Sequence, residues 1–210
     1  MFVLLWLLAC TPESTLRTGD AAEVAQPPGD DEDDIGAPPN WADCAGGYQA
    51  DYFNLTSAHP DFDPPEDARA PDTFDGLDWW DDQHAAHTRF EPSLDQGSNW
   101  WPVDEGFAED PAYFTAHLTA WVRVWDDGPA QFVAGAADDM WVTLNNETII
   151  SLPGIKPFES AVYEVDLSSG QFPLEIRFAH RAGESAIRFR PVDTEQITIC
   201  YPDFSEDTGR

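Results

Sequence analysis

The chain has 210 residues, of which 40 are Asp or Glu and 10 are Lys or Arg, so its formal net charge at pH 7 is −30. A field of this sign repels nucleic acid and anionic lipid headgroups, which excludes both as partners of the folded part. The length and the nine Trp residues indicate one globular domain and exclude a chain that is disordered throughout.

The first residues, MFVLLWLLAC, combine a short apolar run with a cysteine. The run is too short to span a bilayer but matches the apolar core of a secretion signal. Residues 7–10 resemble the lipobox of bacterial lipoproteins, although no Lys or Arg precedes the run. We therefore expect residues 1–9 to be a signal peptide and Cys10 to carry lipid, which implies the outer membrane or cell surface. A plain apolar N-terminus with a buried cysteine is the alternative.

Residues 10–40 contain few large apolar side chains and include the acidic block DDEDD. Such a segment cannot bury enough apolar surface to offset the entropy lost on ordering. We expect it to be a disordered acidic tether, and residues 204–210 to be a flexible tail.

Residues 41–203 show the alternation of polar and apolar side chains that predicts β-strands. It extends over residues 113–125 (YFTAHLTAWVRVW) and recurs in residues 172–178 and 186–191. Turn residues separate these runs, and no long amphipathic helix is evident. The pattern predicts an all-β fold, an antiparallel β-sandwich. Residues 59–112 are acidic and rich in Pro and Trp, which indicates long irregular loops with a functional role.

The cysteine count fits an exported protein. If Cys10 carries lipid, Cys44 and Cys200 remain, and an oxidising compartment lets them form a disulfide. Two free buried thiols are the alternative, and only geometry decides between them.

The stretch DDMWVTLNN resembles the signature of fibro-slime domains, with matches at Asp138, Asp139, Trp141, Val142, Leu144 and Asn145. Residues 59–62 (HPDF) and 178–189 (FAHRAGESAIRF) resemble further elements of that family. The chain departs from the pattern at Asn146, at His180 and at Lys156-Pro157, where the family has Gly, Glu and His-Gly. Fibro-slime domains are similar to the protective-antigen-type (PA-fourteen) domain, so the resemblance implies a jelly-roll-like antiparallel sandwich.

The resemblance also implies a metal site at Asp138 and Asp139. In the lectin branch of the wider family, the Asp pair is joined by a cis peptide and binds calcium, which prefers carboxylate ligands. Glu184 is a candidate for a further ligand. The alternative is a turn in which the Asp side chains accept bonds from nearby backbone N–H groups.

Trp141 and Asn145 are the candidate ligand-binding residues of the same stretch. A Trp face stacks on the apolar face of a sugar ring, which buries a large area with little loss of entropy. The alternative for Trp141 is packing in the core of the sandwich.

No Gly-x-Ser-x-Gly, phosphate loop or His-Glu-x-x-His motif occurs in the sequence, and His84 with His87 offers only two ligands for a metal. We therefore expect no enzymatic activity. The expected function is that of a bacterial surface lipoprotein with a module for adhesion, which binds a glycan or an extracellular matrix polymer and uses calcium if the Asp pair holds it. A structural protein that assembles with other surface proteins is the alternative, and a glycoside hydrolase is the third.

Overall fold

The computed structural model describes residues 38–41, 44–56, 58–62, 73–98, 100–103, 113–181 and 183–202. The predictions for the signal peptide, for the lipid on Cys10, for most of the tether and for the C-terminal tail lie outside the described residues. Within them the fold class is confirmed, since the regular structure consists of strands and one short 3-10 helix, η1 (Asp82–His84). No helix of the described segments is long and apolar enough to cross a membrane.

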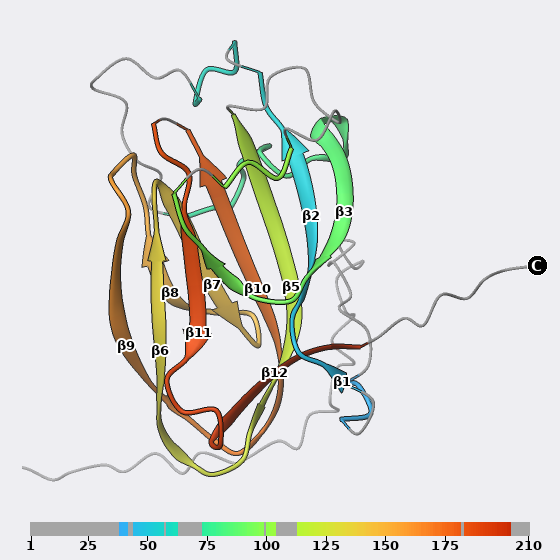
Figure 1. The fold of residues 1–210 in the computed structure, drawn as a ribbon, viewed down its shortest axis with the longest axis vertical. Helices are drawn as coiled ribbons and strands as arrows, with labels where there is room; N and C mark the ends of the chain where they lie inside the picture. Colours follow the sequence, from blue (N-terminus) through green and yellow to red (C-terminus); the bar gives the residue numbers. More distant parts are fainter. Residues whose placement is uncertain are drawn as a thin grey trace, which may run out of the picture. The chain divides into compact units, whose positions relative to one another are not determined.

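The strands form two antiparallel sheets that face each other as the layers of a sandwich (Figure 1). The larger sheet contains β1 (Cys44–Ala45), β2 (Tyr48–Asn54), β3 (Ala85–Glu91), β5 (Phe114–Val124), β7 (Asp139–Leu144), β8 (Glu147–Leu152), β10 (Gly170–His180) and β12 (Ile197–Pro202). The smaller sheet contains β4 (Leu94–Gln96), β6 (Gly128–Ala136), β9 (Glu159–Leu167) and β11 (Ile187–Pro191). The order in the smaller sheet is β4-β11-β6-β9.

The long alternating run predicted at residues 113–125 is β5, which lies at the centre of the larger sheet between β2, β10 and β12. Its residues Leu118, Val122 and Val124 point into the layer between the sheets. There they meet side chains of the smaller sheet, among which the rings of Phe132 and Phe189 stack at 5.2 Å. The apolar face of the alternation therefore builds the main core, as period two requires.

The opposite face of the larger sheet is covered by the loop that precedes η1. The hydroxyl of Thr115 donates to the carbonyl oxygen of Trp79 at 2.7 Å, and the indole of Trp80 donates to the carbonyl oxygen of Ala116 at 3.1 Å. A second group of buried side chains, here called the outer cluster, lies on this face and consists of Leu55, Phe62, Trp79, Trp141 and Ala179. Strands of the larger sheet whose outer face would otherwise contact water are therefore buried on both faces.

Cys44 and Cys200 form a disulfide, which confirms the predicted pairing. Their Cα atoms lie 5.7 Å apart, and the bond joins β1 to β12 across 156 residues of sequence. Cys200 is completely buried.

Candidate functional site

The adjacent aspartates lie at the end of the sandwich where β6 passes into β7, and both are completely buried. Asp138 has a φ of 68°, in the left-handed region that Asp tolerates better than most residues, so the chain bends sharply here. The bend interrupts the regular alternation, in which neighbouring side chains point to opposite faces. The described residues contain no cis peptide bond, so the two aspartates are joined by a trans peptide.

The Asp138 carboxylate accepts main-chain hydrogen bonds from two other segments. Its Oδ1 accepts the N–H of Lys156 at 3.2 Å, and its Oδ2 accepts the N–H of Arg181 at 2.7 Å. The Nδ1 atom of His180 lies 3.2 Å from the same Oδ2. Asp138 therefore connects the loop after β8 and the end of β10 to the bend between β6 and β7.

The Asp139 carboxylate is paired with a buried guanidinium. Its Oδ2 accepts a bond from Nε of Arg181 at 2.7 Å, and its Oδ1 accepts a short bond from the N–H of Gly154. Burial raises the pKa of Asp139, and the charge of Arg181 and the Gly154 bond act against that rise. Both members of the ion pair are out of contact with water, so each depends on the other for its charge to be compensated.

The Lys156 ammonium lies inside a ring of main-chain oxygens, here called the carbonyl cage. Its Nζ lies 2.7 Å from the carbonyl oxygens of Asp138 and Leu152, and 3.3 Å from those of Pro153 and Gly154. Burial lowers the pKa of Lys156, against the charges of the neighbouring aspartates. The side chain is half-buried, although a lysine usually extends its ammonium into water.

As they stand, these carboxylate and carbonyl oxygens do not fit a calcium ion, which takes about six to eight oxygen ligands. The carbonyl cage already surrounds an ammonium, and both Asp side chains are engaged by N–H groups. Glu184, the further ligand suggested by the sequence, is exposed. The site shown is two buried carboxylates balanced by Lys156 and Arg181, and calcium at the pair stays a prediction from the sequence alone.

Of the two candidate ligand-binding residues, Trp141 lies within β7 and Asn145 directly follows the strand. Trp141 is 1% exposed and belongs to the outer cluster, with its ring 6.4 Å from that of Trp79 and 6.2 Å from that of Trp80. Asn145 is exposed and forms, with Asn146, the turn to β8, where both residues have positive φ angles of 51° and 63°. Asn is among the residues that a tight hairpin turn of this kind prefers. The structure thus assigns packing contacts to Trp141 and a turn to Asn145.

A second polar group comes from the loops near η1. His59, Asp78 and His84 each place a ligand-type atom within 4.8 Å of the other two. Nδ1 of His59 accepts the N–H of Asp61 at 3.3 Å, so the neutral ring carries its proton on Nε2, which lies 3.2 Å from Oδ1 of Asp78. Hydrogen bonds therefore account for this group, which among the described residues does not include His87.

Polar side chains and two Trp residues line a hollow of about 290 Å³, whose walls come from β3, from the end of β4 and from the loop after β4. This rim hollow is lined by Arg89, Gln96, Gly97, Ser98, Trp100, Trp101 and Pro102. Trp101 is half-buried, and its ring lies 5.1 Å from that of His180, so the hollow adjoins the network of the two aspartates. Nε of Arg89 donates to Glu91 at 2.6 Å, which fixes the direction of the guanidinium.

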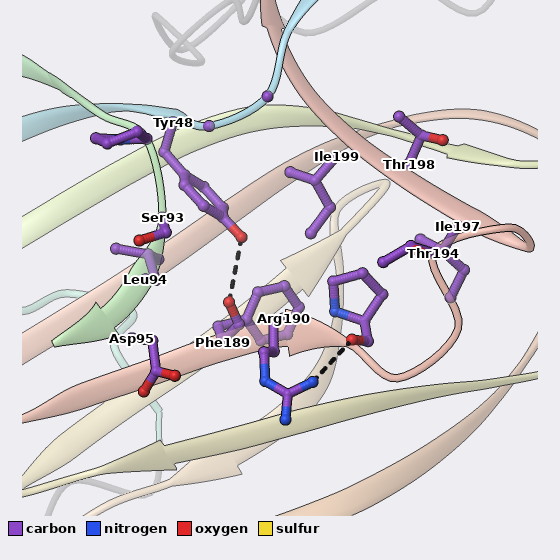
Figure 2. A pocket seen from close by; sticks show the side chains of 14 residues that line it. Tyr48, Ser93, Leu94, Asp95, Phe189, Arg190, Thr194, Ile197, Thr198 and Ile199 are labelled. Atoms are coloured by element: carbon purple, nitrogen blue, oxygen red, sulfur yellow. Dashed lines mark hydrogen bonds between the residues drawn. The ribbon is translucent and has the colours of Figure 1, made fainter. Parts of the chain in front are cut away.

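A separate pocket of about 300 Å³ opens between the start of β2 and strands β4, β11 and β12 (Figure 2). The hydroxyl of Tyr48 donates to the carbonyl oxygen of Phe189 at 3.3 Å, and burial raises the pKa of Tyr48. Leu94, Ile197 and Ile199 supply apolar walls, so this pocket suits an apolar group better than a sugar hydroxyl.

No protein-family model and no curated protein matches the sequence. Among solved structures, the chain is similar to the PA14 sugar-binding domain of an RTX adhesin, with a TM-score of 0.55 and 16% identity, over 70% of this chain and 90% of that one. It is also similar to the PA14 domain of the antifreeze protein MpAFP, with a TM-score of 0.51 and 13% identity, over 80% of this chain and 91% of that one. The fold is a PA14-type β-sandwich. The fibro-slime resemblance stays a prediction.

Sequence reasoning found the aspartates of this PA14-type fold but missed Lys156, Arg181 and the rim hollow as parts of one region. The departure from the family pattern at Lys156 was the available signal. For the rim hollow, the pair Trp100-Trp101 was a weaker signal, because it lies in a region for which the sequence predicted functional loops.

Proposed function

We propose that this chain is a non-catalytic module that binds a glycan at the rim hollow, and that a lipid on Cys10 holds it at a bacterial surface. The observation that carries the proposal is that the half-buried Trp101 lines the same hollow as Arg89, Gln96 and Ser98. Sugar recognition needs an aromatic face for the C–H groups of the ring and polar side chains for its hydroxyls.

The fold alone does not transfer a function, because unrelated activities share the same architecture. A glycan is the first ligand to test, because the adhesin domain of similar fold is a sugar-binding domain. The rim hollow supplies the chemistry for such a ligand on this chain, and it does so without a metal ion.

The buried aspartates support a non-catalytic role. A glycosidase needs one carboxyl group that gives and takes a proton and a second that attacks or activates water, and both must reach the substrate. Asp138 and Asp139 are completely buried and accept bonds from neighbouring N–H groups, so neither is available for that chemistry.

A glycan array probed with the full chain tests the proposal. We expect binding to at least one class of glycan, and at least a tenfold loss of affinity on Trp101→Ala, which corresponds to about 1.4 kcal/mol. Trp125→Ala is the matched control, because Trp125 is 47% exposed and lies just after β5, where it contacts Arg123. Absence of binding to every glycan would contradict the proposed glycan-binding function. An equal loss of affinity in both variants would contradict its location at the rim hollow.

Assembly with other proteins is the second candidate, and β9 is the observation that favours it. Among the strands that the structure describes, β9 pairs only with β6 and so forms an edge of the smaller sheet, and its Val162 is 57% exposed. Free strand edges pair readily with other chains. The acids Glu159, Glu164 and Asp166 work against pairing of β9 with itself, because like charges would meet across the edge. Sedimentation of the full chain alone and mixed with a second, less acidic surface protein tests this candidate. A complex in the mixture, without self-association of the chain alone, would support it.

A further inference from the structure

We propose that the ammonium of Lys156 is the resident cation of the Asp138–Asp139 site. The native chain then needs no metal ion here, and the carbonyl cage takes a divalent cation of the calcium class once this ammonium is removed. The inference is independent of glycan binding and of the rim hollow.

The arrangement of oxygens around Nζ is the first support. An ammonium has three N–H donors, but four carbonyl oxygens lie within 3.3 Å of Nζ. At least one N–H donor is therefore shared between two oxygens. The ammonium is thus held by the combined electrostatic attraction of the four carbonyl oxygens as well as by individual hydrogen bonds. Hard cations such as calcium are bound by oxygens in this way.

The origin of the cage oxygens is the second support. Three of them belong to residues 152–154, the last residue of β8 and the loop that Lys156 itself closes, and the fourth is the carbonyl oxygen of Asp138. The lysine side chain thus curls back over its own loop and ties that loop to the bend between β6 and β7. A bound ion would join the same two segments.

Charge balance is the third support. The buried aspartates carry two negative charges, and Arg181 compensates Asp139 through its 2.7 Å bond. Lys156 supplies the second positive charge, and the charges of both aspartates favour its ammonium form. Without Lys156 the group would lose the ammonium that lies between four converging carbonyl oxygens beside the two buried aspartates, which is a costly change in this site.

Two variants that remove the same charge separate a cation site from a simple clamp. Lys156→Ala empties the cage, whereas Lys156→Met keeps the cage filled with an apolar side chain of similar length. The comparison is needed because a chain with a net charge of −30 gathers calcium weakly over its whole surface. That background is equal in the two variants, so it cancels between them.

The measurement is thermal unfolding of the full chain in EDTA, in CaCl₂ and in MgCl₂ at equal ionic strength. We expect calcium to raise the Tm of the native chain no more than magnesium does. Both variants should melt at lower temperature in EDTA, and calcium should raise the Tm of Lys156→Ala by about 5 °C or more beyond its effect on Lys156→Met, at a concentration well above Kd. Magnesium should do less, because it requires a tighter octahedral site and gives up water reluctantly.

Three results would overturn the proposal. One is a rise in Tm of the native chain that is specific to calcium, since the site would then accept the ion with Lys156 present. The second is an equal response of the two variants to calcium. If Lys156→Ala is unfolded in EDTA, its near-UV circular dichroism is followed as calcium is added, and failure to regain the native signal is the third.

Discussion

Nε of Arg181 lies 2.7 Å from Oδ2 of Asp139, and neither side chain is more than 2% exposed. The same arginine donates from its N–H to Asp138 and from Nη1 to the carbonyl oxygen of Asp61 at 3.2 Å. Its guanidinium also lies 5.3 Å from the ring centre of Trp79. Through its main chain and its side chain, Arg181 thus joins the end of β10, the two aspartates and the loops over the outer face of the larger sheet.

We predict that Arg181→Met lowers the free energy of unfolding by about 3–5 kcal/mol, because it leaves Asp139 buried without its partner. Urea unfolding followed by Trp fluorescence measures the loss. Arg188→Met is the control, since Arg188 pairs with Asp95 at 2.6 Å but the two side chains are 33% and 49% exposed. That pair should contribute no more than about 1 kcal/mol. Similar losses in the two variants would show that the buried Arg181–Asp139 pair stabilises the fold no more than the exposed Arg188–Asp95 pair does.

Trp141 offers a test of packing against ligand binding. Because it is 1% exposed and packed among the rings of the outer cluster, we predict that Trp141→Ala lowers the free energy of unfolding by about 3–5 kcal/mol. The exposed Trp125 serves as the control, and its replacement by Ala should cost about 1 kcal/mol or less. Unchanged stability of Trp141→Ala, together with lost glycan binding, would instead restore the role that the sequence suggested.

Several strands were predictable because their signal is local, whereas β3 and β4 lie within residues 59–112, where the prediction of irregular loops was wrong. Period-two alternation located β5, β10 and β11 to within a residue or two, since a sheet with one apolar face imposes that pattern on each strand. The burial of the other face was not predictable in this way. It depends on Trp79 reaching Thr115, a contact between residues that are 36 positions apart, and no short window of sequence contains both.

The candidate site shows the same division. Asp138 and Asp139 stood out as adjacent acids, but the oxygens of the carbonyl cage are main-chain atoms that every residue possesses, so the residues that supply them carry no mark in the sequence. Lys156 departs from the fibro-slime pattern that the sequence resembles, and this departure indicated a changed site but not the nature of the change. Only the fold shows that the ammonium meets the aspartates.

Glu175 gives a prediction for the effect of pH. Burial alone would raise its pKa, but the hydrogen bond from His117 at 3.1 Å and the nearby charge of Arg177 outweigh burial and hold that pKa below the usual value of 4.5. The carboxylate therefore stabilises the fold above the pKa of the unfolded chain, and this contribution is lost as the pH falls through the lower pKa of the folded state.

We accordingly predict that Glu175→Gln flattens the dependence of the free energy of unfolding on pH below about 4.5, where the native chain loses stability as acid is added. Urea titrations at a series of pH values measure the slope. Glu164→Gln, at an exposed position of β9, is the matched control and should leave that slope close to the native one. An unchanged slope in Glu175→Gln would contradict the contribution assigned to this residue.

The disulfide between Cys44 and Cys200 spans 156 positions of sequence, so it restricts the unfolded chain strongly. The chain-entropy model gives about 5 kcal/mol for a loop of this length. We predict that a reductant lowers the urea midpoint of the native chain, whereas the double variant Cys44→Ala/Cys200→Ala starts lower and does not respond. Unfolded chain without lipid should show one titratable thiol before reduction and all three afterwards, because two of its three cysteines are paired. Three thiols before reduction would mean that the bond does not form, and an unchanged midpoint after complete reduction would mean that it does not stabilise the fold.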